Sequence, residues 1–149
     1  MILSFDVFVS AFLSKISEYE LLAMLEDDRN DVVDGYLRGA LVAFKKNCKY
    51  DLTAAADSET RKFNTDIADN DVDEIVEIIS YGMVCQWLRP FVYQQENLQN
   101  VISTRDFSVY SPAELLMRVG NAYKQAQKEY TQMIREYSYN HGSLTELHL

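Results

Sequence analysis

Apolar residues recur at helical spacing most regularly in the stretch from Ser111 to Tyr139. Its start carries three agreeing signals: Ser111 can cap free backbone N–H groups, Pro112 suits the first helical position, and Glu114 completes a capping box. About 28 residues at about 1.5 Å each make a rod of about 42 Å, longer than a compact core of this size needs. We therefore predict an amphipathic helix over 111–139, part of which projects or meets another chain. Its apolar stripe consists of Leu115, Val119, Ala122, Ala126, Tyr130, Met133 and Tyr137.

The first half of the chain shows helical spacing in shorter pieces. Near the amino terminus we predict a helix capped by Ser4, and a second helix opened by the capping box of Ser17 and Glu20. Another helix is predicted over 28–46, with aspartates at its start and lysines at its end, where the helix dipole favours those charges. The following segment, 47–68, is polar and alanine-rich, which predicts an irregular crossing or a partly helical loop.

The helix predicted over 71–89 is apolar almost all round in its second half, so it should be the most buried helix of the fold. Pro90 removes a backbone donor and disfavours helical geometry at Arg89, so we expect the chain to kink or break there. A further helical segment is predicted over 91–102. It should lead into an extended connection over 104–110.

Composition agrees with a mainly α fold. The 149 residues include two prolines and five glycines, and the alternating runs typical of strands are scarce, so most of the chain is free to be helical. With 48% hydrophobic residues the chain can bury one sizeable core. We predict a single domain over 1–142, a small helical bundle with one long amphipathic helix towards its carboxyl end, and a short tail over 143–149.

The chain is acidic, with a net charge of −9 and a pI near 4.6. This charge argues against wrapping nucleic acid, which takes clustered Lys and Arg, although DNA can slide past an acidic surface. Lys45, Lys46 and Lys49 form the one basic cluster that stands out, and we interpret it as an ordinary helix end. No run of ~18 apolar residues is present, so no membrane span is expected. The opening MILSFDVFVSAFLSK lacks the features of a signal peptide, which predicts a protein made and kept in a cytoplasm.

A calcium site is one alternative for the carboxylates near residue 70. Asp69, Asp71 and Asp73 alternate like the start of a calcium loop, but Glu74 stands where the loop needs Gly and Ser80 where it needs a bidentate Glu. The simpler interpretation places these carboxylates at a helix start, where the dipole favours them.

Other reactive side chains give no catalytic arrangement. Cys48 and Cys85 fit neither a metal spacing nor a disulfide framework, and His141 and His148 lie beyond the last predicted helix. Gly-rich phosphate loops, nucleophile elbows and zinc motifs are missing from the sequence. We therefore expect no enzymatic activity, no cofactor and no metal.

An assembly surface is the more natural use of the apolar and aromatic residues. Ten tyrosines occur, several of them along the long helix, and tyrosine is enriched at protein interfaces. The apolar tail residues need either a partner or a fold-back to cover them. The predicted interface consists of Tyr130, Met133, Ile134, Tyr137, Tyr139, Leu144, Leu147 and Leu149, together with Phe5, Phe8 and Phe12 of the first helix.

The stretch that begins at Gly82 and reads GMVCQWLRPFVYQQENLQNVISTRDFSVYSPAELLMRV, followed by the Tyr-rich helix up to Tyr139, resembles the head-tail adaptor, or connector, proteins of tailed bacteriophages. The resemblance implies a small helical domain that forms a ring beneath the portal. Extended termini or a long helix would grip the portal and the next ring, and DNA would pass through without sequence-specific binding.

The leading hypothesis is thus a structural adaptor in the virion neck, made in the host cytoplasm and assembled as a closed, dodecameric ring through heterologous contacts. Its partners would be the portal and a downstream neck or tail protein. A rival hypothesis is a small acidic regulatory or inhibitor protein of phage origin that binds a host protein. A small helical enzyme subunit is the third alternative.

Overall fold

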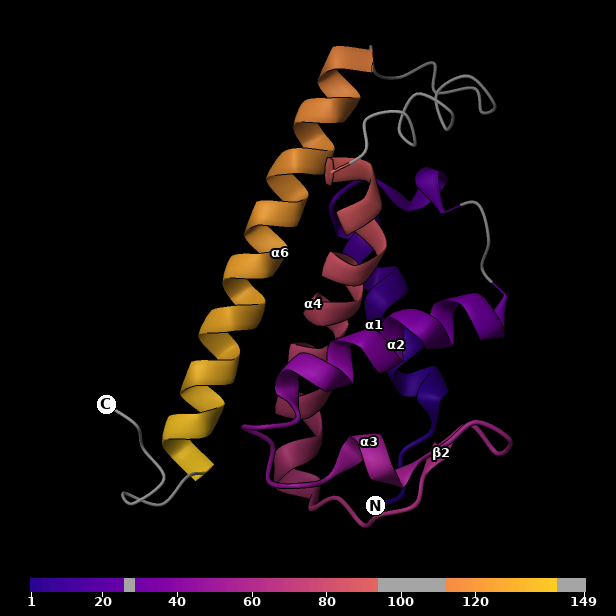
Figure 1. Ribbon diagram of the computed structural model, residues 1–149, viewed down its shortest axis with the longest axis vertical. Helices are drawn as coiled ribbons and strands as arrows, with labels where there is room; N and C mark the ends of the chain where they lie inside the picture. Colours follow the sequence, from indigo (N-terminus) through magenta and orange to yellow (C-terminus); the bar gives the residue numbers. More distant parts are fainter. Residues whose placement is uncertain (26–28, 94–111, 142–149) are drawn as a thin grey trace.

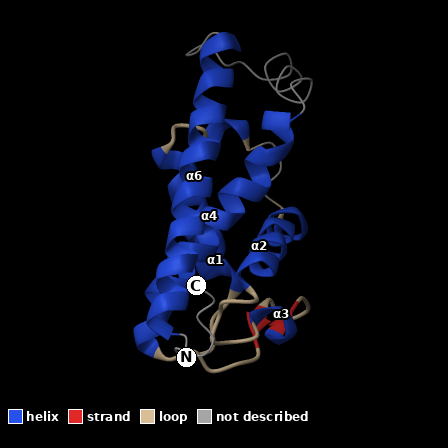
Figure 2. Cartoon of the chain, turned by 60° about the vertical axis from the view of Figure 1, so that its left-hand side comes forward, coloured by secondary structure: helices blue, strands red, loops and turns tan. Residues whose placement is uncertain are grey.

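The computed structural model describes residues 1–25, 29–93 and 112–141, and it is mainly α, as predicted (Figure 1). Four long helices share one core, and a small hairpin lies at one end of the bundle (Figure 2). The elements in chain order are α1 (Phe5–Glu18), the 3-10 turn η1 (Leu22–Met24), α2 (Asn30–Phe44), α3 (Leu52–Ala55), β1 (Ala56–Asp57), β2 (Lys62–Phe63), α4 (Asp69–Tyr93) and α6 (Pro112–His141).

Helix α4 is the centre of the fold, because α1, α2 and α6 all pack against it. Its side chains at Ile75, Ile78, Ile79 and Met83 are fully buried. The prediction that this helix is the most buried one is confirmed. Helices α4 and α6 run antiparallel, so the carboxyl end of α6 lies beside the amino end of α4 (Figure 1).

The break expected at Pro90 does not occur, since α4 continues through Pro90 to Tyr93. Pro90 falls in the last turn, where its missing N–H removes one late hydrogen bond. The flanking side chains hold the turn in place: Trp87 is 3% exposed, and its ring meets that of Phe91 edge-on with centroids 6.2 Å apart. Burial outweighs the local cost of proline here.

Helix α1 begins as predicted, with the Ser4 hydroxyl accepting a hydrogen bond from the Asp6 N–H at 3.2 Å. The second helix expected to open at Ser17 is wrong, because α1 runs through Ser17 to Glu18. The chain then turns at Glu20, whose φ of 61° is left-handed, and only η1 follows. The buried stripe of α1 extends to Ile16, so packing on the core carries the helix past the local capping signal.

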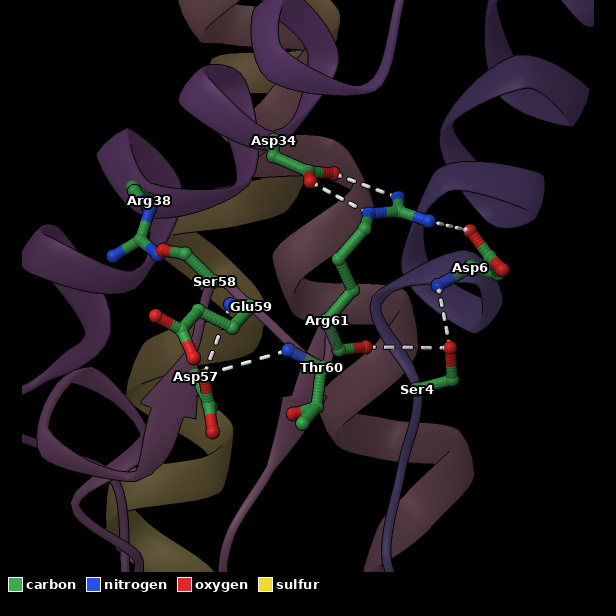
Figure 3. A network of polar contacts seen from close by, with 9 residues as sticks. All are labelled: Ser4, Asp6, Asp34, Arg38, Asp57, Ser58, Glu59, Thr60 and Arg61. Atoms are coloured by element: carbon green, nitrogen blue, oxygen red, sulfur yellow. Dashed lines mark hydrogen bonds and ion pairs between the residues drawn. The ribbon is translucent and has the colours of Figure 1, made fainter.

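Residues 47–68 are partly helical, which agrees with one of the two predicted alternatives, since they contain α3; they also contain the antiparallel β1–β2 hairpin, which the sequence did not predict. The hairpin also pairs with the chain before α1: the Phe63 N–H donates to the Leu3 carbonyl at 2.9 Å. Arg61, beside β2, binds both oxygens of Asp34 on α2 at 2.8 and 2.9 Å, and Asp6 on α1 at 2.6 Å (Figure 3). One guanidinium thus ties the hairpin to two helices.

Helices α2, α4 and α6 are in close contact at Gly82. A Cβ placed there would lie 2.7 Å from the Cβ of Ala40 on α2 and 2.7 Å from the Tyr130 ring on α6. The Tyr130 hydroxyl donates a hydrogen bond to the Ala40 carbonyl at the same place. Gly82 therefore permits the packing that holds α6 against the rest of the bundle.

Candidate interaction surface

The phenylalanines of α1 do not form an interface. Phe5, Phe8 and Phe12 are all 0% exposed. Phe63 of the hairpin packs on the first two, with ring centroids 5.0 and 5.2 Å away, and Trp87 of α4 meets Phe12 edge-on at 6.0 Å. That part of the prediction is wrong, because other segments of the same chain cover the apolar face of α1.

Two tyrosines of α6 from the predicted interface, Tyr130 and Tyr137, also belong to the core. Tyr130 is 9% exposed and bonded to the Ala40 carbonyl, and Tyr137 is fully buried. The Tyr137 ring meets Phe44 edge-on at 5.0 Å, and its hydroxyl accepts a hydrogen bond from the Lys49 N–H at 3.2 Å. Burial raises the pKa of both phenols. The prediction that Tyr130 and Tyr137 belong to an interface is therefore wrong, and α6 is anchored near its end as well as at its start.

The remaining members of the predicted interface differ in exposure. Met133 and Ile134 are half-buried against the core, whereas Tyr139 is 73% exposed. Leu144, Leu147 and Leu149 lie outside the described residues. Among the interface residues predicted within the described ranges, Tyr139 thus stays available to a partner.

The exposed side of α6 carries a second stripe that lies directly opposite the buried one. At 3.6 residues per turn its members fall within roughly 40° of a single line along the helix. We call this surface the outer stripe; it consists of Met117, Asn121, Lys124, Lys128, Thr131, Arg135 and Tyr139. All seven residues are exposed, and two of them are large apolar or aromatic side chains, Met117 at 59% and Tyr139 at 73%.

The outer stripe is basic although the protein is acidic. It contains Lys124, Lys128 and Arg135 and no carboxylate. Within the parts of the chain that the structure describes, none of these three cations has an ion-pair partner. Glutamates of α6 lie to the side and accept hydrogen bonds from glutamines: Gln125 donates to Glu129 at 2.9 Å and Gln132 to Glu136 at 3.3 Å.

A shallow hollow of about 480 Å³ runs along this stripe. The described residues that line it are Lys124, Gln127, Lys128, Thr131, Gln132 and Arg135. A second hollow of about 340 Å³ lies at Arg135, Glu136, Tyr139 and Asn140, so a concave strip continues towards the end of the helix. Both hollows are open to solvent. Their shape suits an elongated protein surface better than an enclosed small molecule.

A counterpart of opposite charge lies at the hairpin end of the bundle, beside the start of α4. The Tyr50 hydroxyl donates to Asp71 at 2.7 Å and accepts from the Ala68 N–H at 3.1 Å, which brings the start of α3 next to the start of α4. We call the exposed carboxylates on these two starts the acidic base; they are Asp51, Asp69 and Asp73. Among the described residues none of the three is in an ion pair, while nearby Lys49 faces buried Asp71 at 3.8 Å.

The carboxylates considered as a calcium loop belong to this helical start. Helix α4 begins at Asp69, so residues that a calcium loop would need are already helical, and Asp71 is 7% exposed and bonded to Tyr50. In residues 1–25, 29–93 and 112–141, no group of three or more His, Cys, Asp or Glu side chains is placed to hold a metal ion.

The cysteines are separate and reduced. Burial raises the pKa of the Cys85 thiol to about 11 and also raises that of Cys48. At neutral pH both therefore stay protonated, which makes them poor nucleophiles. Within the same described ranges, no helix combines the length and the apolar content that crossing a membrane takes.

No protein-family model matches the chain, and searches among curated proteins and solved structures found no significant match.

The outer stripe can be found in the sequence from the positions of the charged residues around the helix. Lys124, Lys128 and Arg135 are spaced by four and by seven residues, which places them on one side of any helix. The prediction followed the apolar residues of the same helix, and those define the side that is buried.

Proposed function

We propose that this protein is a structural adaptor of a tailed-phage neck, which works by holding neighbouring subunits and not by transforming a substrate. In this proposal copies of the chain form a closed, dodecameric ring between the portal and the next neck or tail component. The resemblance of the stretch from Gly82 to Tyr139 to phage head-tail adaptor proteins supports the phage assignment.

The observation that carries the proposal is the outer stripe of α6. It is a long, exposed strip on which Met, Tyr and Arg occur together, and these residue types are enriched at protein interfaces. Its three cations have no partner within the described parts of the chain, so an acidic protein surface can supply their counter-charges. A surface of this kind fits subunit contacts.

The attachment of α6 to the core supports a role in holding neighbouring subunits. Leu115, Val119, Ala126 and Tyr137 are each 0–1% exposed, so the inner side of the helix is fixed from its first turns to its last. A binding surface on a helix whose other side is packed loses little conformational entropy when a partner docks. The ring contacts would therefore form on a pre-organised surface.

The acidic composition suits the passage of DNA. A net charge of −9 repels phosphate over most of the surface, so that DNA passing through a ring would not adhere. In this arrangement the basic outer stripe is used between subunits and is kept away from the lumen.

Co-assembly with portal rings tests the proposal. The purified chain is mixed with portal, and the mass of the complex is measured by light scattering after size exclusion. A complex of fixed stoichiometry is expected. A chain that stays monomeric and never joins a portal ring, at any protein concentration, would contradict the adaptor role. A monomer that instead captures a host protein would favour the regulatory alternative.

A further inference from the structure

We infer that the ring contact joins two different faces of the chain, the outer stripe of one copy and the acidic base of the next. This inference rests on the proposed function, since it names the surfaces that would make the subunit contact. The starting observation is that all three charges of the outer stripe, on Lys124, Lys128 and Arg135, have the same sign.

A stripe with one sign of charge is not self-complementary. In a two-fold symmetric dimer each surface meets its own copy, so Lys124, Lys128 and Arg135 would face three further cations. Like charges placed opposite one another cost binding energy and exclude such a pairing. If the outer stripe binds a second copy, it must therefore bind a different face of it.

The acidic base supplies that different face. It offers three exposed carboxylates, Asp51, Asp69 and Asp73, against three cations. Asp69 and Asp73 are four residues apart on α4, as Lys124 and Lys128 are on α6, so both pairs present charges one helical turn apart.

The two faces lie on different parts of the same molecule. The outer stripe follows the exposed side of α6, and the acidic base lies on α3 and the start of α4 (Figure 1). One copy can therefore use both faces at once. Contacts of this head-to-tail kind produce a closed ring when the rotation between neighbours closes, and an open filament when it does not.

Apolar ends distinguish this stripe from a phosphate-binding one. Met117 and Tyr139 lie at the two ends of the cationic part and are 59% and 73% exposed. Such residues gain energy from burial against a protein surface, while a phosphate backbone is contacted mainly by Lys, Arg and small polar groups. Nucleic acid is therefore the less suitable partner.

Charge reversal tests the inference. A stripe variant carries Lys124→Glu, Lys128→Glu and Arg135→Glu, and a base variant carries Asp69→Lys and Asp73→Lys. For each variant alone, the amount of ring assembled on the portal should fall at least about tenfold, because its outer stripe and its acidic base then carry charges of the same sign. An equimolar mixture of the two variants should regain assembly, because each reversed face then finds a reversed partner.

A matched control carries Lys45→Glu, Lys46→Glu and Lys62→Glu, which changes the net charge as much at three exposed lysines elsewhere. It should assemble as the unsubstituted chain does. Circular dichroism checks that all variants are folded. Assembly that survives both reversals, or a mixture that fails to regain it, would overturn the inference; the proposed ring would still stand if the unsubstituted chain assembles. DNA binding by the unsubstituted chain that the stripe variant loses, with unchanged assembly, would also overturn it, in favour of a phosphate partner. Failure of the unsubstituted chain to assemble would contradict the proposed function instead.

Discussion

The hydroxyl of Tyr137 accepts a hydrogen bond from the backbone N–H of Lys49, at 3.2 Å, although the residues are 88 positions apart in the sequence. With the edge-on contact between Tyr137 and Phe44, this bond fixes the last turns of α6 to the end of α2. The part of α6 that looked free in the sequence is therefore held by the core, and its outward side is free for a partner.

Replacing Tyr137 should destabilise the fold strongly. Tyr137→Ala removes a fully buried ring and should lower the free energy of unfolding by about 3–5 kcal/mol. Tyr137→Phe keeps the ring and loses one hydrogen bond, which should cost about 1 kcal/mol. Urea unfolding measures both. Tyr139→Ala is the matched control at an exposed position and should change stability by less than about 0.5 kcal/mol. Equal effects of the alanine substitutions at 137 and 139 would refute the burial of Tyr137.

The two glycines at Gly82 and Gly35 should respond in opposite directions to alanine. Gly82→Ala places a methyl group 2.7 Å from both Ala40 and the Tyr130 ring, which should cost about 1–3 kcal/mol in thermal or urea unfolding. Gly35→Ala meets nothing within 4 Å and lies in the exposed middle of α2, so it should stabilise by about 0.5–1 kcal/mol. A neutral Gly82→Ala would show that α2, α4 and α6 are not in close contact there.

Stability should fall in alkali. Burial raises the pKa of Tyr19 above its usual 10.0, to about 12, and raises those of Tyr81 and Tyr123 as well. Below pH 10 these phenols are protonated in the folded and unfolded chains alike. Between pH 10 and 12 the unfolded chain loses protons that the folded chain keeps, so the equilibrium moves towards unfolding. The urea midpoint should therefore drop over that window, and Tyr19→Phe should reduce the drop. A midpoint that is constant up to pH 12 would disprove the burial of these phenols.

Sequence spacing predicted the elements whose signals are local and agree with one another. The apolar stripe of α6 and the apolar second half of α4 gave both helices and the central place of α4. Spacing shows which side of a helix is buried, but it cannot show what covers that side. For this reason the spacing alone predicts an interface at Phe5, Phe8 and Phe12, although Phe63 and Trp87 of the same chain cover them.

Long-range packing explains the remaining differences between the sequence predictions and the structure. Pro90 stays helical because Trp87 and Leu88 are buried beside it, and α1 passes Ser17 because Ile16 is buried. The hairpin strands have two residues each, too few for a period, and their position depends on the contacts of Arg61 with Asp34 and Asp6. The outer stripe of α6 depends on charge, which the apolar periodicity does not record.

Imaging of the chain bound to portal rings tests the central claim most directly. Class averages from electron cryomicroscopy should show a closed ring of 17.2 kDa subunits in which α6 of each copy lies at the contact with its neighbour. The outer stripe should be covered by the α3 and α4 starts of the next copy. Isolated copies on the portal, or a ring in which the exposed side of α6 faces solvent, would contradict the account.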